Sequence, residues 1–157
     1  MTQTPRVTWK TLLVILVITL GAGFGVSMAT RSNMSVYDSI VKPSFAPPPW
    51  LFPVVWTLLY AAMSVSLWLI FRSTKPAPGT IALYAVQLIV NLTWPFLFFT
   101  FEAFGLAFWW LLLLLALVVW LMILAFRAEA LAGWLLVPYA LWVTFAGVLS
   151  FAVARLN

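Results

Sequence analysis

The sequence of 157 residues contains no cysteine and no histidine. Their absence excludes disulfides, thiolate nucleophiles, zinc sites of the usual kinds and haem held by His or Cys. Carboxylates are almost as scarce, since Asp38, Glu102 and Glu129 are the only acidic side chains. Acid–base catalysis by paired carboxylates therefore has almost no residues to use.

Charge of either sign is rare in this chain. Only 7% of the residues are charged and 66% are hydrophobic, with a mean hydropathy of +1.14. A soluble chain carries roughly 25% charged residues, so this composition is that of an integral membrane protein whose surroundings are the lipid bilayer. The net charge of +5 lies near the ends of apolar runs. Basic residues in such places usually set the orientation of a protein in the membrane. We therefore expect no nucleic-acid partner.

Five apolar runs approach the length of about 20 residues that a membrane-spanning helix needs. They predict helices at 11–29, 51–71, 81–101, 105–126 and 133–154. The first run has no small-residue cleavage site before a soluble region, so we expect a retained helix and not a signal peptide. Short Pro/Gly-rich or polar links place consecutive helices next to each other and antiparallel. The prediction is one domain, 1–157, an all-α membrane protein with a single bundle of five transmembrane helices.

The basic residues divide unevenly between the two sides of this bundle. Three fall on the side of the 30–50 loop, namely Arg31, Lys42 and Arg155; five fall on the other, namely Arg6, Lys10, Arg72, Lys75 and Arg127. The positive-inside rule then predicts a cytoplasmic N-terminus, with the loop facing away from the cytoplasm.

The third run carries polar residues at bilayer depth. Tyr84, Gln87 and Asn91 are spaced i, i+3 and i+7, so they share one helix face. Pro95 cannot donate to the carbonyl of Asn91, which leaves a free acceptor there. Buried amides facing lipid are costly, so this face must turn inward. Two interpretations remain open: hydrogen bonds between helices, and a polar wall of a cavity.

Two other runs place aromatic residues on one face. The second has Phe52, Trp56 and Tyr60 at every fourth position, and the fifth has Pro138, Trp142 and Phe145. Trp142 lies about 18 Å from its helix end at 1.5 Å per residue, too deep for an interfacial belt. Four other tryptophans lie near the ends of the apolar runs, where an aromatic belt at the membrane interface is expected: Trp9, Trp109, Trp110 and Trp134. Because Trp56, Asn91 and Trp142 all reach the bilayer half beside residues 30–50, we expect one pocket that opens toward that loop.

The stretch KPSFAPPPWLFPVVW, residues 42–56, is rich in proline and aromatics. Proline fixes φ near −65° and does not support a helix interior, so APPP predicts a stiff, extended segment. Two interpretations fit Phe45 and Trp50. The loop is either a pre-formed lid over the pocket or a surface loop whose rings dip into the headgroups.

Three segments together resemble one family closely: KPSFAPPPWLFPVVWTLLY, YAVQLIVNLTWPFLFF and VPYALWVTFAGVL. They are similar to the translocator protein or tryptophan-rich sensory protein (TspO/MBR) family, over about residues 37–157. The resemblance implies a five-helix, commonly homodimeric membrane protein that binds tetrapyrroles such as protoporphyrin IX, as a ligand and not a cofactor. Animal members also bind cholesterol. We expect a bacterial member in the cell membrane, with the outer membrane as the alternative.

The resemblance also implies a set of ligand-binding residues. By position these are Tyr37, Phe45, Pro47, Trp50, Trp56, Asn91, Phe98 and Trp142, and we add Gln87, Phe145 and Ala146 on the same helix faces. No metal site is expected. The sequence departs from the family at Val36 and Phe45, where tryptophan is usual, and at Ser150, where asparagine is frequent. The loss of two tryptophans weakens stacking on a flat ligand.

A membrane receptor or sensor for tetrapyrroles is the function that these observations favour. One alternative is light-dependent degradation of porphyrin, in which Trp56 and Trp142 are catalytic. Another is transport of porphyrin or sterol, although the chain shows neither intramembrane charges nor inverted repeats. Arg31 and Lys42 either pair ligand carboxylates or contact lipid headgroups. The GxxxG formed by Gly21 and Gly25 favours internal helix packing over a dimer seam.

Overall fold

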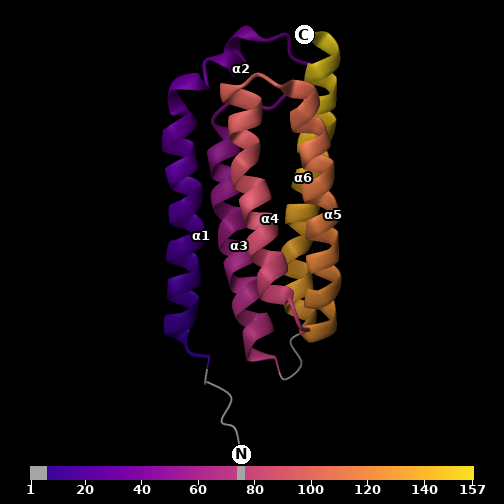
Figure 1. Cartoon of the computed structure of the whole chain (residues 1–157). Helices are drawn as coiled ribbons and strands as arrows, with labels where there is room; N and C mark the ends of the chain where they lie inside the picture. The colour runs from indigo at the N-terminus through magenta and orange to yellow at the C-terminus, as the bar shows by residue number, and fades with distance from the viewer. Residues whose placement is uncertain (1–6, 74–76) are drawn as a thin grey trace, which may run out of the picture.

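A computed structural model describes residues 7–73 and 77–157. Five helices long and apolar enough to cross a membrane stand side by side in one bundle (Figure 1). They are α1 (Trp9–Thr30), α3 (Leu51–Arg72), α4 (Thr80–Pro95) with its continuation η2 (Phe96–Thr100), α5 (Phe104–Ala128) and α6 (Ala130–Leu156). Their ends lie within three residues of the predicted ones, and the all-α five-helix fold is confirmed.

The helix that begins with α4 changes character at Pro95. Beyond the proline, residues 96–100 form a π-helix, and Phe101 N–H donates to the carbonyl of Phe96 at 2.9 Å. Proline has no N–H to continue the ordinary ladder, which accounts for a change of winding at this point. Phe98 and Phe99 of the π-turn are buried, and both rings contact Trp94.

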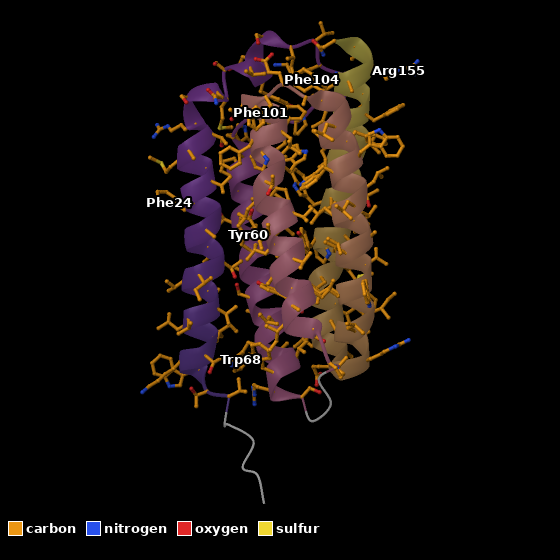
Figure 2. All side chains as sticks on the ribbon, viewed as in Figure 1. Phe24, Tyr60, Trp68, Phe101, Phe104 and Arg155 are labelled. Atoms are coloured by element: carbon orange, nitrogen blue, oxygen red, sulfur yellow. The ribbon has the colours of Figure 1, made fainter. Side chains whose placement is uncertain are left out.

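Helix α1 is the least buried helix of the bundle. It buries Ile15, Thr19 and Thr30 out of 22 residues, and it packs chiefly against α3 and only lightly against α4. Figure 2 shows Phe24 projecting away from the bundle while Tyr60 of α3 lies inside it. By contrast, α5 and α6 pack closely along their length. One side of the bundle is therefore tight and the other loose.

The prediction for the GxxxG of α1 is wrong. Gly21 and Gly25 are exposed, and a Cβ at either position would meet no described atom within 4 Å. Gly23 makes the close approach instead, because a Cβ there would overlap the ring of Tyr60. Homodimer formation stays a prediction.

The charged residues mark the two ends of the bundle. Helix ends at one end carry Lys10, Arg72 and Arg127, while Arg31, Lys42 and Arg155 lie at the other end, where Figure 2 labels Arg155. Arg6 and Lys75 lie outside the described residues. Each of the six described cations thus lies at the end that the sequence assigned to it, three at each end; the excess at one end depends on Arg6 and Lys75, and the orientation stays a prediction.

The loop between α1 and α3 is only partly extended. Its first half forms two short helical turns, η1 (Arg31–Asn33) and α2 (Val36–Ser39), which the sequence analysis did not predict. The stretch that follows, residues 40–50, holds the prolines and contains no regular helix. The loop crosses the end of the bundle toward α6 (Figure 1).

Candidate functional site

A chain of hydrogen bonds joins three helices in the middle of the bundle. Tyr60 OH donates to Asn91 Oδ1 at 2.7 Å, Asn91 Nδ2 donates to Tyr139 OH at 2.8 Å, and Tyr139 OH donates to Gln87 Oε1 at 2.8 Å. All four side chains are buried. The inward orientation of Gln87 and Asn91 is therefore confirmed, and Gln87 serves the contact between helices.

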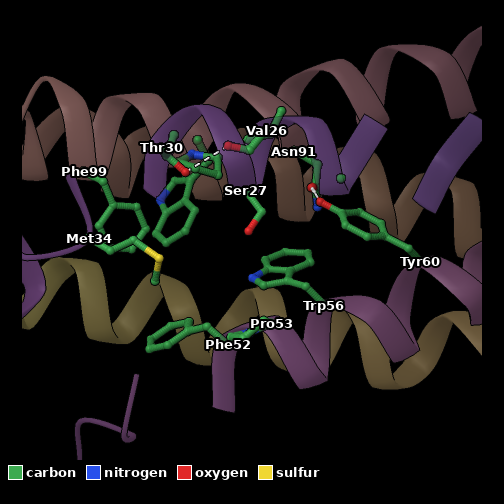
Figure 3. A pocket seen from close by; sticks show the side chains of 13 residues that line it. Val26, Ser27, Thr30, Met34, Phe52, Pro53, Trp56, Tyr60, Asn91 and Phe99 are labelled. Atoms are coloured by element: carbon green, nitrogen blue, oxygen red, sulfur yellow. Dashed lines mark hydrogen bonds between the residues drawn. The ribbon is translucent and has the colours of Figure 1, made fainter. Parts of the chain in front are cut away.

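A cavity of about 120 Å³ lies next to this chain, between α1, α3 and α4. Thirteen residues form its wall: Gly23, Val26, Ser27, Thr30, Met34, Phe52, Pro53, Trp56, Tyr60, Asn91, Trp94, Pro95 and Phe99. These described residues include no charged side chain. Figure 3 shows the Trp56 nitrogen and the Ser27 hydroxyl both turned toward the open centre. Asn91 thus belongs to the hydrogen-bond chain and to the cavity wall.

Helix α3 supplies the aromatic wall. Phe52, Trp56 and Tyr60 follow one another at every fourth position, and all three line the cavity, as their spacing indicated. Trp56 stacks on Tyr60 with ring centroids 5.6 Å apart and meets the edge of Tyr139 at 6.2 Å. The rings that hold Trp56 in place are therefore the same ones that hydrogen-bond Asn91.

Helix α1 forms a wall that the sequence analysis missed. Gly23, Ser27 and Thr30 line the cavity, and they are small or hydroxylated residues spaced i, i+4 and i+7 in a largely apolar helix. Thr30 Oγ1 donates to the Val26 carbonyl at 2.9 Å, so this hydroxyl is already used. The spacing of the three small residues is the signal that could have found this wall.

Trp94 of α4 was also missed. Its side chain is 4% exposed, it lines the cavity, and its Nε1 has no hydrogen-bond partner among the described residues. An indole nitrogen can only donate. Trp94 therefore gives the wall part of its ring, while its N–H is buried away from the open space and has no acceptor within the described chain.

Trp142 lies outside this cavity, so the expectation of one pocket with Trp56, Asn91 and Trp142 is not met. Trp142 lines a separate groove between α3 and α6, formed by Val55, Leu58, Leu59, Pro138, Leu141, Trp142 and Phe145. The ring of Phe52 stands between the two spaces, edge-on to Trp142 at 6.0 Å. A bulky side chain at the start of α3 thus separates residues that helix depth alone placed together.

Several other predicted residues lie around these two spaces. Phe98 is 2% exposed and packs behind Trp94 at 5.3 Å, and Ala146 is buried within α6. Phe45 of the loop meets Phe145 edge-on at 6.3 Å, whereas Trp50 is 65% exposed. Of these residues, Phe45 and Phe145 connect the loop to the groove.

One predicted belt residue has a different position. Trp9, Trp109 and Trp134 are each about two-thirds exposed at 65%, 66% and 64%, as expected for the membrane interface. Trp110 is half-buried instead, and its Nε1 donates to the Val90 carbonyl of α4 at 2.8 Å. Its role is to hold α5 against α4.

The loop is fastened internally around Tyr37. Its ring is 2% exposed, its hydroxyl donates to the Pro47 carbonyl at 2.9 Å, and Lys42 Nζ donates to the Tyr37 carbonyl at 2.8 Å. Burial, together with the Asp38 carboxylate, raises the pKa of Tyr37, so its phenol stays protonated and able to donate. Tyr37 also meets Phe52 edge-on at 5.3 Å, which joins the loop to the cavity wall.

The loop is tied to α6 by one asparagine. Asn157 Oδ1 accepts from Val41 N–H at 3.0 Å, and Asn157 Nδ2 donates to the Val41 carbonyl at 3.1 Å. Both backbone groups of Val41 are thus held by a single side chain. With Phe45 on Phe145, this pair fixes the loop across the end of the bundle, the position of a lid.

A scan against known families places residues 13–156 in the TspO/MBR family. The chain is a member of the TspO/MBR family. It is 39% identical to the protein CrtK of Rhodobacter capsulatus over 85% of each chain. It is 38% identical to the tryptophan-rich protein TspO of Chlorobaculum tepidum, over 94% of this chain and 96% of the relative. It is 32% identical to the human translocator protein, over 88% and 84%.

Membership in the TspO/MBR family confirms the resemblance read from the three motifs. The first motif forms the second half of the loop and the aromatic wall of α3. The second runs through α4 and its π-turn, and the third lies in α6 with Tyr139 and Trp142. The motifs that indicated the family thus supply the hydrogen-bond chain, the groove and the cavity walls on α3 and α4, while the wall on α1 lies outside them.

Proposed function

We propose that this TspO/MBR protein is a membrane receptor or sensor that binds tetrapyrroles such as protoporphyrin IX beneath the loop of residues 31–50. The observation that carries the proposal is the composition and place of the cavity wall. Its described residues are mostly aromatic, include the Asn91 amide and carry no charge, and the cavity lies directly under a loop that hydrogen bonds hold in place. A flat apolar ring system is best held between aromatic faces with a few oriented polar groups. Phe52 and Trp56 supply faces, and Asn91 supplies the amide.

The size of the cavity sets a requirement on this binding. An apolar cavity of about 150 Å³ holds one benzene ring, so a space of about 120 Å³ is too small for four linked pyrroles. A tetrapyrrole must therefore enlarge the site. Phe52 is the ring that separates the cavity from the groove of Trp142, and its movement would join the two into one larger site. The conformation described here is then the closed one.

The mouth of the site can supply charge for the ligand's carboxylates. Arg31 begins the loop and is exposed, and Lys42 Nζ lies 4.8 Å from the Tyr37 ring centroid while donating to the Tyr37 carbonyl. Both cations are at the membrane surface, where a carboxylate remains hydrated. The tetrapyrrole would lie with its apolar edge in the bundle and its carboxylates under the loop.

Titration of the full chain in lipid nanodiscs with protoporphyrin IX tests the proposal, followed by the porphyrin's own absorbance. We expect saturable binding that Trp56→Leu weakens at least tenfold, because the residue supplies one of the two indole rings of the wall and its nitrogen faces the open centre. Trp134→Leu is the matched control, since that tryptophan is exposed and lies at the other end of the bundle. Uptake equal to that of empty nanodiscs, or equal loss in both variants, would contradict the proposal.

A further inference from the structure

The end of the bundle opposite the loop carries an excess of positive charge. Among the described residues, three cations lie there, Lys10 on α1, Arg72 on α3 and Arg127 on α5, together with one carboxylate, Glu129. All four side chains are exposed, and no ion pair joins them within the described chain. This end therefore presents uncompensated cations to the membrane surface, which suits an anionic partner.

Two of these cations lie on either side of one tryptophan. Trp68 of α3 is half-buried, and its Nε1 donates to the Thr8 carbonyl at 3.1 Å. The guanidinium carbon of Arg72 lies 4.5 Å from the centroid of the Trp68 ring. Lys10 follows Thr8 by two residues, in the first turn of α1. Trp68, which Figure 2 labels at this end, thus holds the end of α3 against the beginning of α1, with a cation on each helix.

The stacked guanidinium of Arg72 keeps its hydrogen-bond donors free. It makes no side-chain hydrogen bond with residues 7–73 or 77–157, although a guanidinium has five N–H donors in one plane. Stacking on an indole restricts the side chain without using these donors. Such a planar fork matches a phosphate, which it binds through two parallel hydrogen bonds. The Trp68 N–H is already used, so this ring positions Arg72 and does not itself bind the anion.

The position of these cations in the membrane favours a lipid phosphate. Trp9 is 65% exposed, as expected at the membrane interface, and the exposed apolar side chains of Leu13 and Val17 follow on α1. A phospholipid can therefore place its phosphate beside Lys10 and Arg72 and its acyl chains along this apolar surface. Basic residues between transmembrane helices at the membrane surface commonly recognise acidic headgroups.

We propose that the phosphate of an acidic phospholipid binds between Lys10 and Arg72 and holds α1 against α3. Helix α1 is the least buried helix, and Trp68 to Thr8 is the one side-chain hydrogen bond between α1 with its N-cap and α3 in the part of the chain that the structure describes. A phosphate with one cation from each helix adds a second link at this end. The proposal is independent of tetrapyrrole binding, since it concerns the opposite end of the bundle.

The first experiment measures lipid affinity by native mass spectrometry of the full chain in detergent. The probes are phosphatidylglycerol, which is acidic, and phosphatidylcholine with the same acyl chains, so only the headgroup differs. We expect at least tenfold tighter binding of phosphatidylglycerol. Arg72→Gln and Lys10→Gln should each weaken its binding about fivefold, the factor that one basic side chain contributes beside an acidic membrane surface.

Arg127→Gln is the matched control for these two variants. It removes the same charge from the same end of the bundle, but the structure gives Arg127 no aromatic ring to stack on among the described residues. Binding of phosphatidylglycerol should then change less than twofold. Equal affinity for the two lipids, or equal losses in Arg72→Gln and Arg127→Gln, would overturn the site. Displacement of the lipid by millimolar inorganic phosphate would identify a site for soluble anions and overturn the lipid assignment.

The second experiment tests whether the lipid fastens α1. Amide hydrogen exchange over residues 12–16 is compared in nanodiscs of phosphatidylcholine alone and of an equal mixture with phosphatidylglycerol. We expect at least threefold slower exchange in the mixture, an effect that Arg72→Gln removes and Arg127→Gln keeps, with no change over loop residues 40–46. Equal slowing in Arg72→Gln, or no slowing in the parent chain, would refute the link between α1 and α3.

Discussion

At the scale of single residues, Tyr139 combines two hydrogen bonds with an aromatic contact. Its side chain is fully buried, and its hydroxyl accepts from Asn91 and donates to Gln87. Its ring edge also meets Trp56. A single phenol on α6 therefore orients an amide and an indole that both face the cavity.

Tyr139→Phe removes the hydroxyl and keeps the ring. Asn91 Nδ2 and Gln87 Oε1 then lose their partner inside the buried part of the bundle. Hydrogen bonds within membranes contribute about 0.6 kcal/mol on average and at most about 1.7 kcal/mol, so losing two should cost roughly 1–3 kcal/mol of unfolding free energy. Unfolding in mixed micelles by added SDS, followed by circular dichroism, measures the loss.

Thr93→Val is the matched control for this prediction. Its hydroxyl donates within its own helix to the Ile89 carbonyl at 2.7 Å, and the residue is only partly buried. That change should alter the unfolding free energy by less than about 0.5 kcal/mol. If the two variants are equally stable, the chain of hydrogen bonds does not stabilise the bundle.

At the scale of elements, the contact of α1 with α3 depends on Gly23. Gly23→Ala places a methyl group against the Tyr60 ring, and the overlap must push α1 away or displace the tyrosine. Overpacking of this kind costs about 1–3 kcal/mol. We expect lower stability in the same SDS titration and a shifted indole resonance of Trp56, which stacks on Tyr60.

Gly21→Ala and Gly25→Ala bracket this prediction on the same helix. Neither new methyl group meets a described atom within 4 Å, and alanine is the better helix former. If the protein is a monomer, both variants should have the same free energy of unfolding as the parent chain. A loss of stability as large as that of Gly23→Ala would instead mean that Gly21 or Gly25 packs against another molecule, such as a second copy of the chain.

The loop is a second element with one decisive contact. Asn157→Ala removes both hydrogen bonds to Val41 and leaves the rest of the loop's fastening around Tyr37 in place. We expect at least tenfold faster amide hydrogen exchange over residues 40–46, with little change in α3, measured by mass spectrometry. Ser39→Ala is the control, because its hydroxyl bonds only within the loop, to the Val36 carbonyl. Unchanged exchange at Val41 would mean that the prolines alone hold the loop.

The elements also show what the sequence could and could not predict. Helix spacing was enough to turn Tyr84, Gln87 and Asn91 inward, because polar groups at that depth have nowhere else to go. The wall of α1 was hidden, since apolar residues surround that helix and its small residues do not gather on one face; Gly23, Ser27 and Thr30 line the cavity, whereas Gly21 and Gly25 are exposed. Depth along a helix placed Trp142 near Trp56, but the rotation of α6 and the ring of Phe52 separate them. Spacing gives the face of one helix, whereas the contact between two helices depends on side-chain shape.

At the scale of the whole molecule, tight and loose packing occur on opposite sides of one bundle. Helices α5 and α6 form a closely packed pair, and α1 lies at the outer edge (Figure 1). The cavity forms where the loose helix meets α3 and α4, and the loop closes the same end. A membrane protein that must admit an apolar ligand gains from this arrangement, because one helix and one loop can move while the hydrogen-bond chain keeps the other helices in register.

The arrangement of charge over the whole molecule predicts its direction in the membrane. Five basic residues on the side of the N-terminus against three on the side of the loop favour a cytoplasmic N-terminus. Single cysteines at exposed Ser39 and exposed Glu129 report the two ends, because the native chain has none. A membrane-impermeant maleimide should label Ser39→Cys in intact cells and Glu129→Cys only after the cells are permeabilised, while buried Ser66→Cys gives the background. The reverse pattern would put the loop and the mouth of the site in the cytoplasm, where a ligand would have to come from within the cell.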